Sequence, residues 1–311
     1  MRVFVTGASG WIGSAVVPEL IGAGHQVVGL ARSNASAAAV AGAGAEVQRG
    51  TLDDLDTLRR AAAASDGVIH LAFKHDTAFS GGFQDAADAD RRAVEVLGEV
   101  LAGSDRPFVI ASGVLGLAPG GVRTERDGHA SDPVVGTLSS GPRTRWATAE
   151  LALSLASRGV RSSVVRLAPT NHGDGDHGFL ATLVGVARER GTSGHVGDGT
   201  NHWPAVHRLD SAHLFRLALE RAPAGSTLHA VADEGVPIRK VAEVIGRHLD
   251  LPVISVAAED AAEHFGWLGA FIGADCTASS ALTRELLAWQ PIQPGLIEDL
   301  DQGHYFRGPS T

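Results

Sequence analysis

Short apolar runs alternate with helical patterns along the first half of the chain. The apolar or β-branched runs lie at 2–5, 26–30, near 47, 67–71, 108–111 and 160–167. Segments with helical patterns separate them, at 11–23, 54–64, 88–101 and 145–158. Buried strands separated by helices are typical of βαβ units, in which helices cover both faces of a parallel sheet. The pattern therefore predicts an α/β fold with a doubly wound parallel sheet.

The regular alternation stops after Leu167. Two loops rich in glycine follow, and the remaining helical and strand patterns are irregularly spaced. At 311 residues the chain exceeds the size at which one core usually stops growing. We therefore expect residues 1–168 to form the main domain, with 204–232 returning to it. Residues 169–203 and 233–311 are expected to form a smaller C-terminal lobe over the substrate.

A glycine-rich turn follows the first predicted strand directly, with the sequence Thr-Gly-Ala-Ser-Gly-Trp-Ile-Gly over 6–13. Such glycines let the backbone turn tightly and approach a pyrophosphate, while amides at the helix start hold the anion. The motif, in this strand–turn–helix context, predicts a Rossmann dinucleotide site. Its expected cofactor contacts are Thr6, Gly7, Ser9, Gly10, Trp11, Ile12 and Gly13.

The end of the second predicted strand favours NADP as the cofactor. A carboxylate there would accept a hydrogen bond from the ribose 2′-hydroxyl of NAD, whereas an arginine can meet the 2′-phosphate of NADP. The strand ends in Arg32 and Ser33 and has no acidic residue. A solvated arginine stacked on the adenine is the alternative, and it leaves NAD open.

The motif order resembles the short-chain dehydrogenase/reductase superfamily, in particular its extended and atypical members. Besides the glycine motif, the resemblance rests on Val68–Ala72, Arg166–Pro169 followed by His172-Gly173, Val206–Asp210, and Leu287–Pro291. The resemblance implies an NAD(P) cofactor and places Leu52 or Asp53 near the adenine. Asp53 is alternatively a helix N-cap. It also places Leu71, Ala72, Phe73 and Lys74 beside the dinucleotide and Pro169 near the nicotinamide.

The superfamily's usual Tyr-x-x-x-Lys pair is expected to be missing. The single tyrosine, Tyr305, lies near the C-terminus. The pair should fall at Gly141 and Arg145, or at Pro142 and Trp146, and neither register supplies a proton donor. By resemblance, Arg145 keeps the ribose contact of the lysine, although a surface arginine is equally expected. Ser112 matches the serine that bonds a substrate carbonyl, with a structural serine as its alternative.

Histidines are candidates for the missing proton donor, because the chain has 14 of them. His75 and His172 follow predicted strands, and ligands of doubly wound sheets bind beyond the strands' carboxyl ends. Lys74 is a further candidate for the acid role. For any one histidine, an ordinary loop position is the alternative.

Composition limits the other classes of function. The net charge of −9, from 26 basic and 35 acidic residues, argues against nucleic acid or an anionic membrane surface as the main partner. A single cysteine, Cys276, argues against a disulfide framework and favours a cytoplasmic setting. The N-terminal apolar run is too short for a signal-peptide core. We expect no metal site. The sequence has no Gly-x-Ser-x-Gly elbow at a strand-to-helix turn, so we do not expect a Ser-His-Asp hydrolase.

The leading hypothesis is an NADP(H)-dependent oxidoreductase that reduces a carbonyl or related group of a small molecule. Two alternatives stay open: a sugar-nucleotide epimerase or dehydratase, and a non-catalytic protein that senses the dinucleotide. A homodimer is common among the proteins that the chain resembles, and nothing in the sequence establishes one here.

Overall fold

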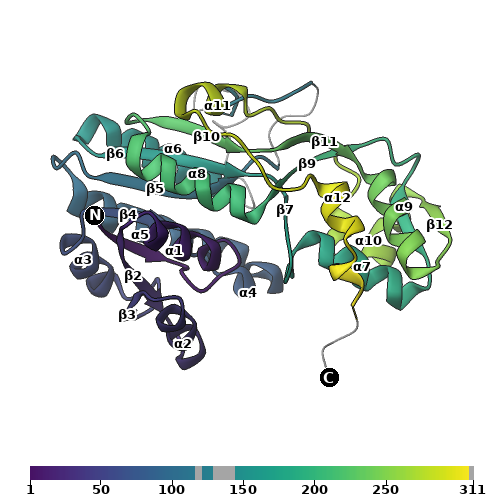
Figure 1. The fold of residues 1–311 in the computed structure, drawn as a ribbon, viewed down its shortest axis with the longest axis horizontal. Helices are drawn as coiled ribbons and strands as arrows, with labels where there is room; N and C mark the ends of the chain where they lie inside the picture. The colour runs from purple at the N-terminus through teal and green to yellow at the C-terminus, as the bar shows by residue number, and fades with distance from the viewer. Residues whose placement is uncertain (116–120, 129–143, 308–311) are drawn as a thin grey trace.

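A seven-stranded sheet forms the centre of the computed structural model, which describes residues 1–115, 121–128 and 144–307 (Figure 1). The strand order is β10-β6-β5-β4-β1-β2-β3, and every pairing is parallel. The strands are β1 (Arg2–Thr6), β2 (Gln26–Ala31), β3 (Glu46–Arg49), β4 (Gly67–His70), β5 (Pro107–Gly113), β6 (Arg161–Leu167) and β10 (Ser226–Ala230). The predicted doubly wound α/β fold is confirmed.

Helices cover both faces of this sheet, and alternate residues of each strand bury themselves against one layer or the other. In β1, Val3 and Val5 pack with α1 (Gly13–Gly22) and α8 (Arg208–Arg221). Phe4 between them packs on the opposite face. That face is covered by α3 (Leu55–Ala63), α5 (Phe83–Leu101) and α6 (Thr144–Ser154). The helix α2 (Asn34–Gly42) contacts β2 and the edge strand β3.

The C-terminal lobe lies at one end of the large sheet (Figure 1). It contains a three-stranded sheet, β11-β9-β7, and a two-stranded sheet, β12-β8. The strands are β7 (Thr170–His172), β8 (Ser193–Val196), β9 (His202–His207), β11 (Asp233–Pro237) and β12 (Val253–Val256). The lobe helices are α7 (Phe179–Arg190), α9 (Ile238–Leu249), α10 (Ala261–Phe265) and α12 (Leu296–Asp301). The chain returns to the large sheet at α11 (Ala281–Leu287), which contacts β10 and α8 (Figure 1).

Only part of the segment 204–232 joins the large sheet. Strand β10 pairs with β6, and α8 packs on the sheet face, but β9 pairs with β7 and β11 in the lobe. The chain therefore passes from the lobe to the main sheet between His207 and Ser226. The expected division into two domains is our proposal.

Two C-terminal motifs of the sequence meet through Asp210. The indole Nε1 of Trp289 donates to the Asp210 carbonyl oxygen at 3.1 Å. The Asp210 carboxylate accepts from the backbone amides of Ile292 and Gln293 at 3.0 and 3.1 Å. Asp210 thus ties the segment after Trp289 to the first turn of α8, which explains why the two motifs occur together.

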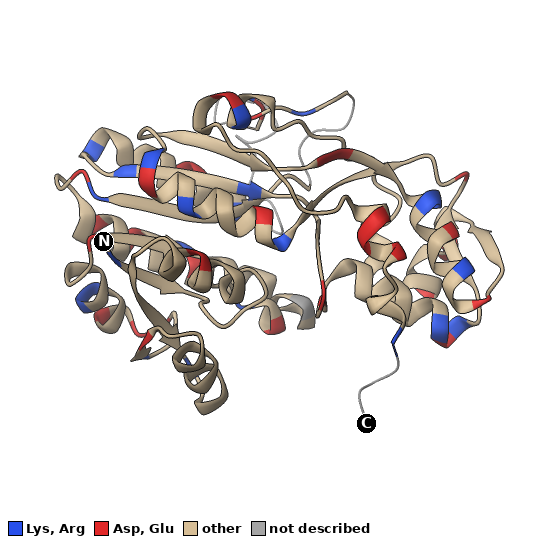
Figure 2. Ribbon diagram, in the orientation of Figure 1, with Lys and Arg blue, Asp and Glu red and all other residues tan. Residues whose placement is uncertain are grey.

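Acidic and basic residues are interspersed along the helices of both parts of the molecule (Figure 2). Among the described residues, no helix is long and apolar enough to cross a membrane.

The turn after β1 brings backbone against backbone. Gly7 has a φ of +69°, and a Cβ atom added to it would lie 2.8 Å from the amide nitrogen of Ala72. A Cβ atom on Gly13 would lie only 2.1 Å from the carbonyl oxygen of Gly7. The glycines are therefore required by packing at these two positions, because any side chain would push α1 away from β4.

We predict that Gly13→Ala destabilises the protein by about 1–3 kcal/mol, because the added methyl group overlaps a backbone oxygen that cannot rotate away. Gly22→Ala is the matched control, because it lies in the same helix and a Cβ atom added to it would have nothing within 4 Å. It should stabilise by about 0.5–1 kcal/mol through helix propensity. Urea unfolding followed by circular dichroism measures both, and equal effects would contradict the packing argument.

Candidate functional site

The first turn of α1 is open to an anion. Its N-cap residue, Ile12, has no side-chain cap, and the turn contains no acidic residue. The glycine turn leads into it, since the Gly10 amide donates to the Gly7 carbonyl oxygen at 2.9 Å. Ser9 and Gly10 are exposed. Uncapped backbone N–H groups and the helix dipole suit a diphosphate at this position, so the residues present fit a dinucleotide.

Thr6, one of the expected cofactor contacts, also makes hydrogen bonds within the protein. Its side chain is buried, with Oγ1 2.8 Å from His70 Nδ1, and it accepts from the Ala72 amide at 3.2 Å. His70 Nε2 lies 3.0 Å from the buried Asp90 carboxylate. Sequence reasoning missed His70 and Asp90. The available signal was a histidine inside an apolar strand, which needs a buried polar partner.

The ends of β2 and β3 present two arginines. Arg32 is largely exposed and pairs with Asp76 at 3.0 Å. Arg49, which sequence reasoning missed, donates to the Ser33 carbonyl oxygen and to Asn34 Oδ1. The hydroxyl of Ser33 caps α2 by accepting from the Ser36 amide at 3.1 Å. Two guanidinium groups, those of Arg32 and Arg49, therefore come from the ends of β2 and β3 around Ser33.

Three further predicted contacts lie near this end of the site. Lys74 Nζ lies 2.7 and 2.6 Å from the two carboxylate oxygens of Asp53. The interpretation of Asp53 as a helix N-cap was wrong, because Asp54 caps α3 by accepting from the Thr57 amide. Leu52 is buried in the core beneath α3.

A second group of predicted residues comes together after β4. The Arg145 guanidinium lies 4.2 Å from the centre of the Phe73 ring and donates to the Ala111 carbonyl oxygen at 3.2 Å. The His75 ring packs edge-on against Phe73 at 5.1 Å. Leu71, Ala72 and Pro169 are half-buried around the strand ends. The alternative positions Gly141 and Pro142 lie outside the described residues.

Desolvation of the imidazole lowers the pKa of His75, although the residue remains partly exposed. The positive charge of Arg145 lowers this pKa further, while Asp76 and Asp90 oppose the shift. The base form of His75 is thus favoured at neutral pH, next to the residues expected around the nicotinamide.

Ser112 lies next to the last residue of β5, and its hydroxyl is buried without a hydrogen-bond partner among the described residues. In the sheet register it lies beside Arg166, and Arg166 lies beside His229. Arg166 donates to the carbonyl oxygens of Asp127 and Gly128 at 2.6 and 3.1 Å. It therefore holds the segment 121–128 against the strand ends next to Ser112.

The same segment is anchored from α11. Glu125 accepts from the amide and hydroxyl of Thr283 at 2.7 and 2.5 Å. His229 Nδ1 lies 2.8 Å from the Ser279 carbonyl oxygen, and burial lowers the pKa of His229 to about 4. Sequence reasoning missed this buried polar group, because its members lie far apart along the chain.

His172 is fully buried away from His75. Its Nδ1 lies 2.9 Å from the Asp299 carboxylate on α12, and its ring meets His207 edge-on at 5.4 Å. Tyr305 secures the loop that follows, accepting from the Gly173 amide at 3.1 Å and donating to Asp176 at 3.0 Å. His172, the last residue of β7, is thus tied to the C-terminal helix α12.

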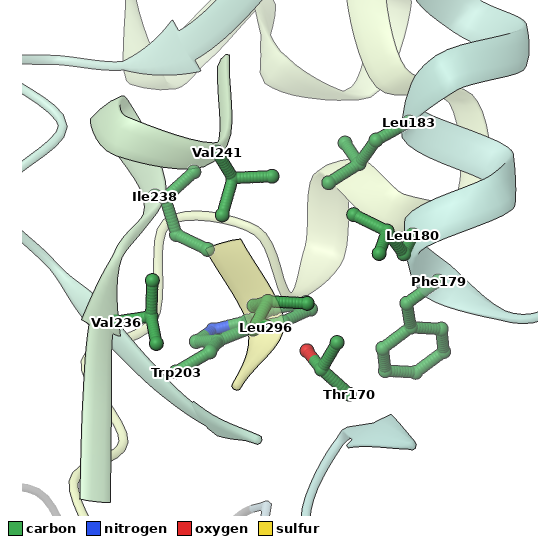
Figure 3. A pocket seen from close by; sticks show the side chains of 9 residues that line it. All are labelled: Thr170, Phe179, Leu180, Leu183, Trp203, Val236, Ile238, Val241 and Leu296. Atoms are coloured by element: carbon green, nitrogen blue, oxygen red, sulfur yellow. The ribbon is translucent and has the colours of Figure 1, made fainter. Parts of the chain in front are cut away.

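The structure describes no group of three or more His, Cys, Asp or Glu side chains suited to a metal ion, within the ranges it covers. Burial raises the pKa of the Cys276 thiol to about 11. A small cavity lies inside the lobe (Figure 3), lined by Thr170, Phe179, Leu180, Leu183, Trp203, Val236, Ile238, Val241 and Leu296. Its lining is almost entirely apolar, so it is a gap in the lobe core rather than a reaction site.

Comparison with known proteins places the chain among relatives of this architecture. The model of the NAD-dependent epimerase/dehydratase family matches residues 3–231. An uncharacterised protein of Schizosaccharomyces pombe is 47% identical over 98% of this chain and 100% of its own length. The 4-hydroxy-2-methyl-3-oxo-4-farnesyl-3,4-dihydroquinoline-1-oxide ketoreductase of Stigmatella aurantiaca is 28% identical, over 86% of this chain and 80% of its own.

The fold is also that of solved structures. DesIV, a dTDP-glucose 4,6-dehydratase from Streptomyces venezuelae crystallised with NAD, superposes with a TM-score of 0.76 at 21% identity. The superposition covers 98% of this chain and 97% of that one. The glycine turn, the open start of α1 and the family match over most of the chain lead to one conclusion: this protein belongs to the NAD-dependent epimerase/dehydratase family of NAD-binding oxidoreductases.

Proposed function

We propose that this protein reduces a carbonyl group of a small molecule with NADP(H). The observation that carries the proposal is the open start of α1 together with the accessible group formed by His75, Phe73 and Arg145. The similarity to a ketoreductase supports the same class of reaction. When bound, the cofactor supplies the hydride, while the protein supplies binding, orientation and proton transfer.

NADP is favoured over NAD by the charges at the ends of β2 and β3. Arg32 precedes Ser33 directly, Arg49 donates to the Ser33 carbonyl oxygen, and β2 ends without a carboxylate that could accept from a ribose hydroxyl. The partner of Arg32, Asp76, is itself highly exposed. Such exposed ion pairs contribute little stability, so a phosphate can replace Asp76 at small cost.

In this proposal His75 transfers the proton to the substrate oxygen. It is the better of the two predicted histidines, because it is partly exposed and next to Arg145, whereas His172 is fully buried against Asp299. Arg145, fixed on Phe73, is proposed to hold the ribose. The buried, unpartnered hydroxyl of Ser112 is proposed to orient the substrate carbonyl after a small local rearrangement.

An epimerase or dehydratase acting on a sugar nucleotide is the second candidate, supported by membership of the family. The two candidates differ in cofactor balance. A carbonyl reductase consumes one NADPH for each product molecule, whereas an epimerase returns its cofactor to the starting state and consumes none.

We predict that Arg32→Ala weakens NADPH binding about 10-fold to 100-fold and leaves NADH binding nearly unchanged, because only NADPH carries the 2′-phosphate. Fluorescence titration of the purified protein with each cofactor measures both constants. Arg239→Ala, which removes an exposed arginine from α9 in the lobe, is the charge-matched control. Tighter binding of NADH than of NADPH by the wild type would contradict the NADP assignment.

We predict that His75→Ala lowers kcat for carbonyl reduction about 10²-fold to 10⁴-fold with an unchanged NADPH Kd. Because the pKa of His75 is lowered, its protonated form accumulates only below the usual 6.5. The wild-type rate should therefore rise as pH falls through that range, and the variant should lack this rise. NADPH oxidation with a panel of ketones and aldehydes measures the profile.

His248→Ala, a variant of a surface histidine paired with Asp301, controls for general effects of losing an imidazole. An identical pH profile for wild type and His75→Ala would remove His75 from the proposed mechanism.

A further inference from the structure

Trp11 connects the glycine turn to the C-terminal part of the chain. Its indole Nε1 donates to the carbonyl oxygen of Asn171 at 2.8 Å. The guanidinium carbon of Arg208, the first residue of α8, lies 4.3 Å from the centre of the indole ring. His177 meets the same indole edge-on at 5.6 Å. The Trp11 indole at the open start of α1 therefore contacts both a guanidinium and an imidazole.

Arg208 has no oxygen partner within the described parts of the chain: it makes neither an ion pair nor a hydrogen bond there. It is nevertheless half-buried. In the same helix, Arg216 pairs with Glu19 at 2.7 Å and with Glu220 at 3.1 Å. A half-buried guanidinium has five N–H donors, and such groups normally find acceptors.

Two carboxylates from the segments around Arg208 and Trp11 already accept other hydrogen bonds. Asp210, two residues further along α8, accepts from the amides of Ile292 and Gln293. Asp176, in the loop beside Trp11, accepts from Tyr305 and from the Gly178 amide. Burial raises the pKa of Asp176, which further weakens it as a counter-charge. Because acidic residues outnumber basic ones in this chain, which has a net charge of −9, an arginine without an acidic partner among the described residues is unusual.

We propose that Arg208, positioned over the Trp11 ring, binds an oxyanion at the junction of the glycine turn and the lobe. The chemistry of the ligand is that of a phosphate or carboxylate group, which a guanidinium binds through two parallel hydrogen bonds. Stacking on the indole fixes the guanidinium plane in advance and lowers the entropy lost on binding. The source is either the diphosphate of the dinucleotide or an anionic group of the substrate. The inference rests on the proposed function, because it places Arg208 beside the cofactor.

The test uses Arg208→Gln, which removes the charge, and Arg208→Lys, which keeps the charge but loses the planar fork. Arg221→Gln, at the exposed far end of α8, is the matched control with the same change of net charge. Each variant is titrated with NADPH by fluorescence. Thermal melting is then recorded with inorganic phosphate and with malonate, both with and without saturating NADPH.

An increase of about 10-fold or more in the NADPH Kd of Arg208→Gln, with Arg221→Gln unchanged, supports the proposal and assigns Arg208 to the diphosphate. An unchanged NADPH Kd together with loss of the Tm increase caused by phosphate or malonate supports it and assigns Arg208 to the substrate. In either case Arg208→Lys should retain only part of the binding that Arg208→Gln loses, since a lysine binds as a point charge.

The proposal is overturned if Arg208→Gln and Arg221→Gln match the wild type in both titrations. It is also overturned if neither anion raises the wild-type Tm and the NADPH Kd is unaffected by the Arg208 variants. A wild type that binds neither NADPH nor NADH would refute the proposed function instead. In that case, thermal melting with phosphate or malonate in the absence of cofactor would still show whether Arg208 binds an anion.

Discussion

The close approach of the turn after β1 to the end of β4 is the constraint on which the rest of the site depends. Gly7 and Gly13 allow this approach, because a side chain at either place would overlap backbone atoms. The buried contacts from Thr6 to His70 and from His70 to Asp90 hold the two strands at this separation. The constraint sets where α1 begins, and the start of α1 in turn sets where an anion can bind.

An acidic protein that binds an anionic cofactor must arrange its positive charges locally. Two basic residues near the predicted adenosine end, Arg32 and Lys74, are paired with aspartates that are more than half exposed. Pairs of this kind are close to neutral in free energy, so a ligand phosphate can replace the carboxylate at little cost. Arg145 and Arg208 are instead positioned by aromatic rings, Phe73 and Trp11. Ring stacking orients a guanidinium without neutralising it, so its charge stays available to a ligand.

Local signals in the sequence were sufficient for the large sheet and for the glycine turn. Apart from β3, each strand of the first half is rich in short apolar runs, and Gly7 lies directly after one of them, so period and spacing specify both features. The position of β9 was less accessible, because its apolar pattern does not show whether its neighbours are β10 and β6 or β7 and β11. The same limit applies to Asp53 and Asp54, adjacent aspartates that differ only in which one reaches the Thr57 amide.

Buried polar contacts between distant segments were the hardest feature to anticipate. His172 follows a strand and stands before a glycine-rich loop, as a site residue would, but its partner Asp299 lies 127 residues further along the chain. Arg166, Glu125 and His229 show the same difficulty, because hydrogen bonds between remote segments leave no periodic trace in a sequence. Such groups are recognised only when the fold brings their partners together.

The single tyrosine illustrates how this long-range packing bears on chemistry. Its hydroxyl is enclosed by the loop at 173–178, accepting from Gly173 and donating to Asp176. Burial and the neighbouring Asp176 carboxylate raise the pKa of Tyr305 well above its usual value. A phenol held in this way keeps its proton, so Tyr305 is poorly suited to donate one to a substrate near neutral pH. In the proposed carbonyl reduction, the proton is therefore assigned to a group that titrates closer to neutrality, the exposed His75 beside Arg145.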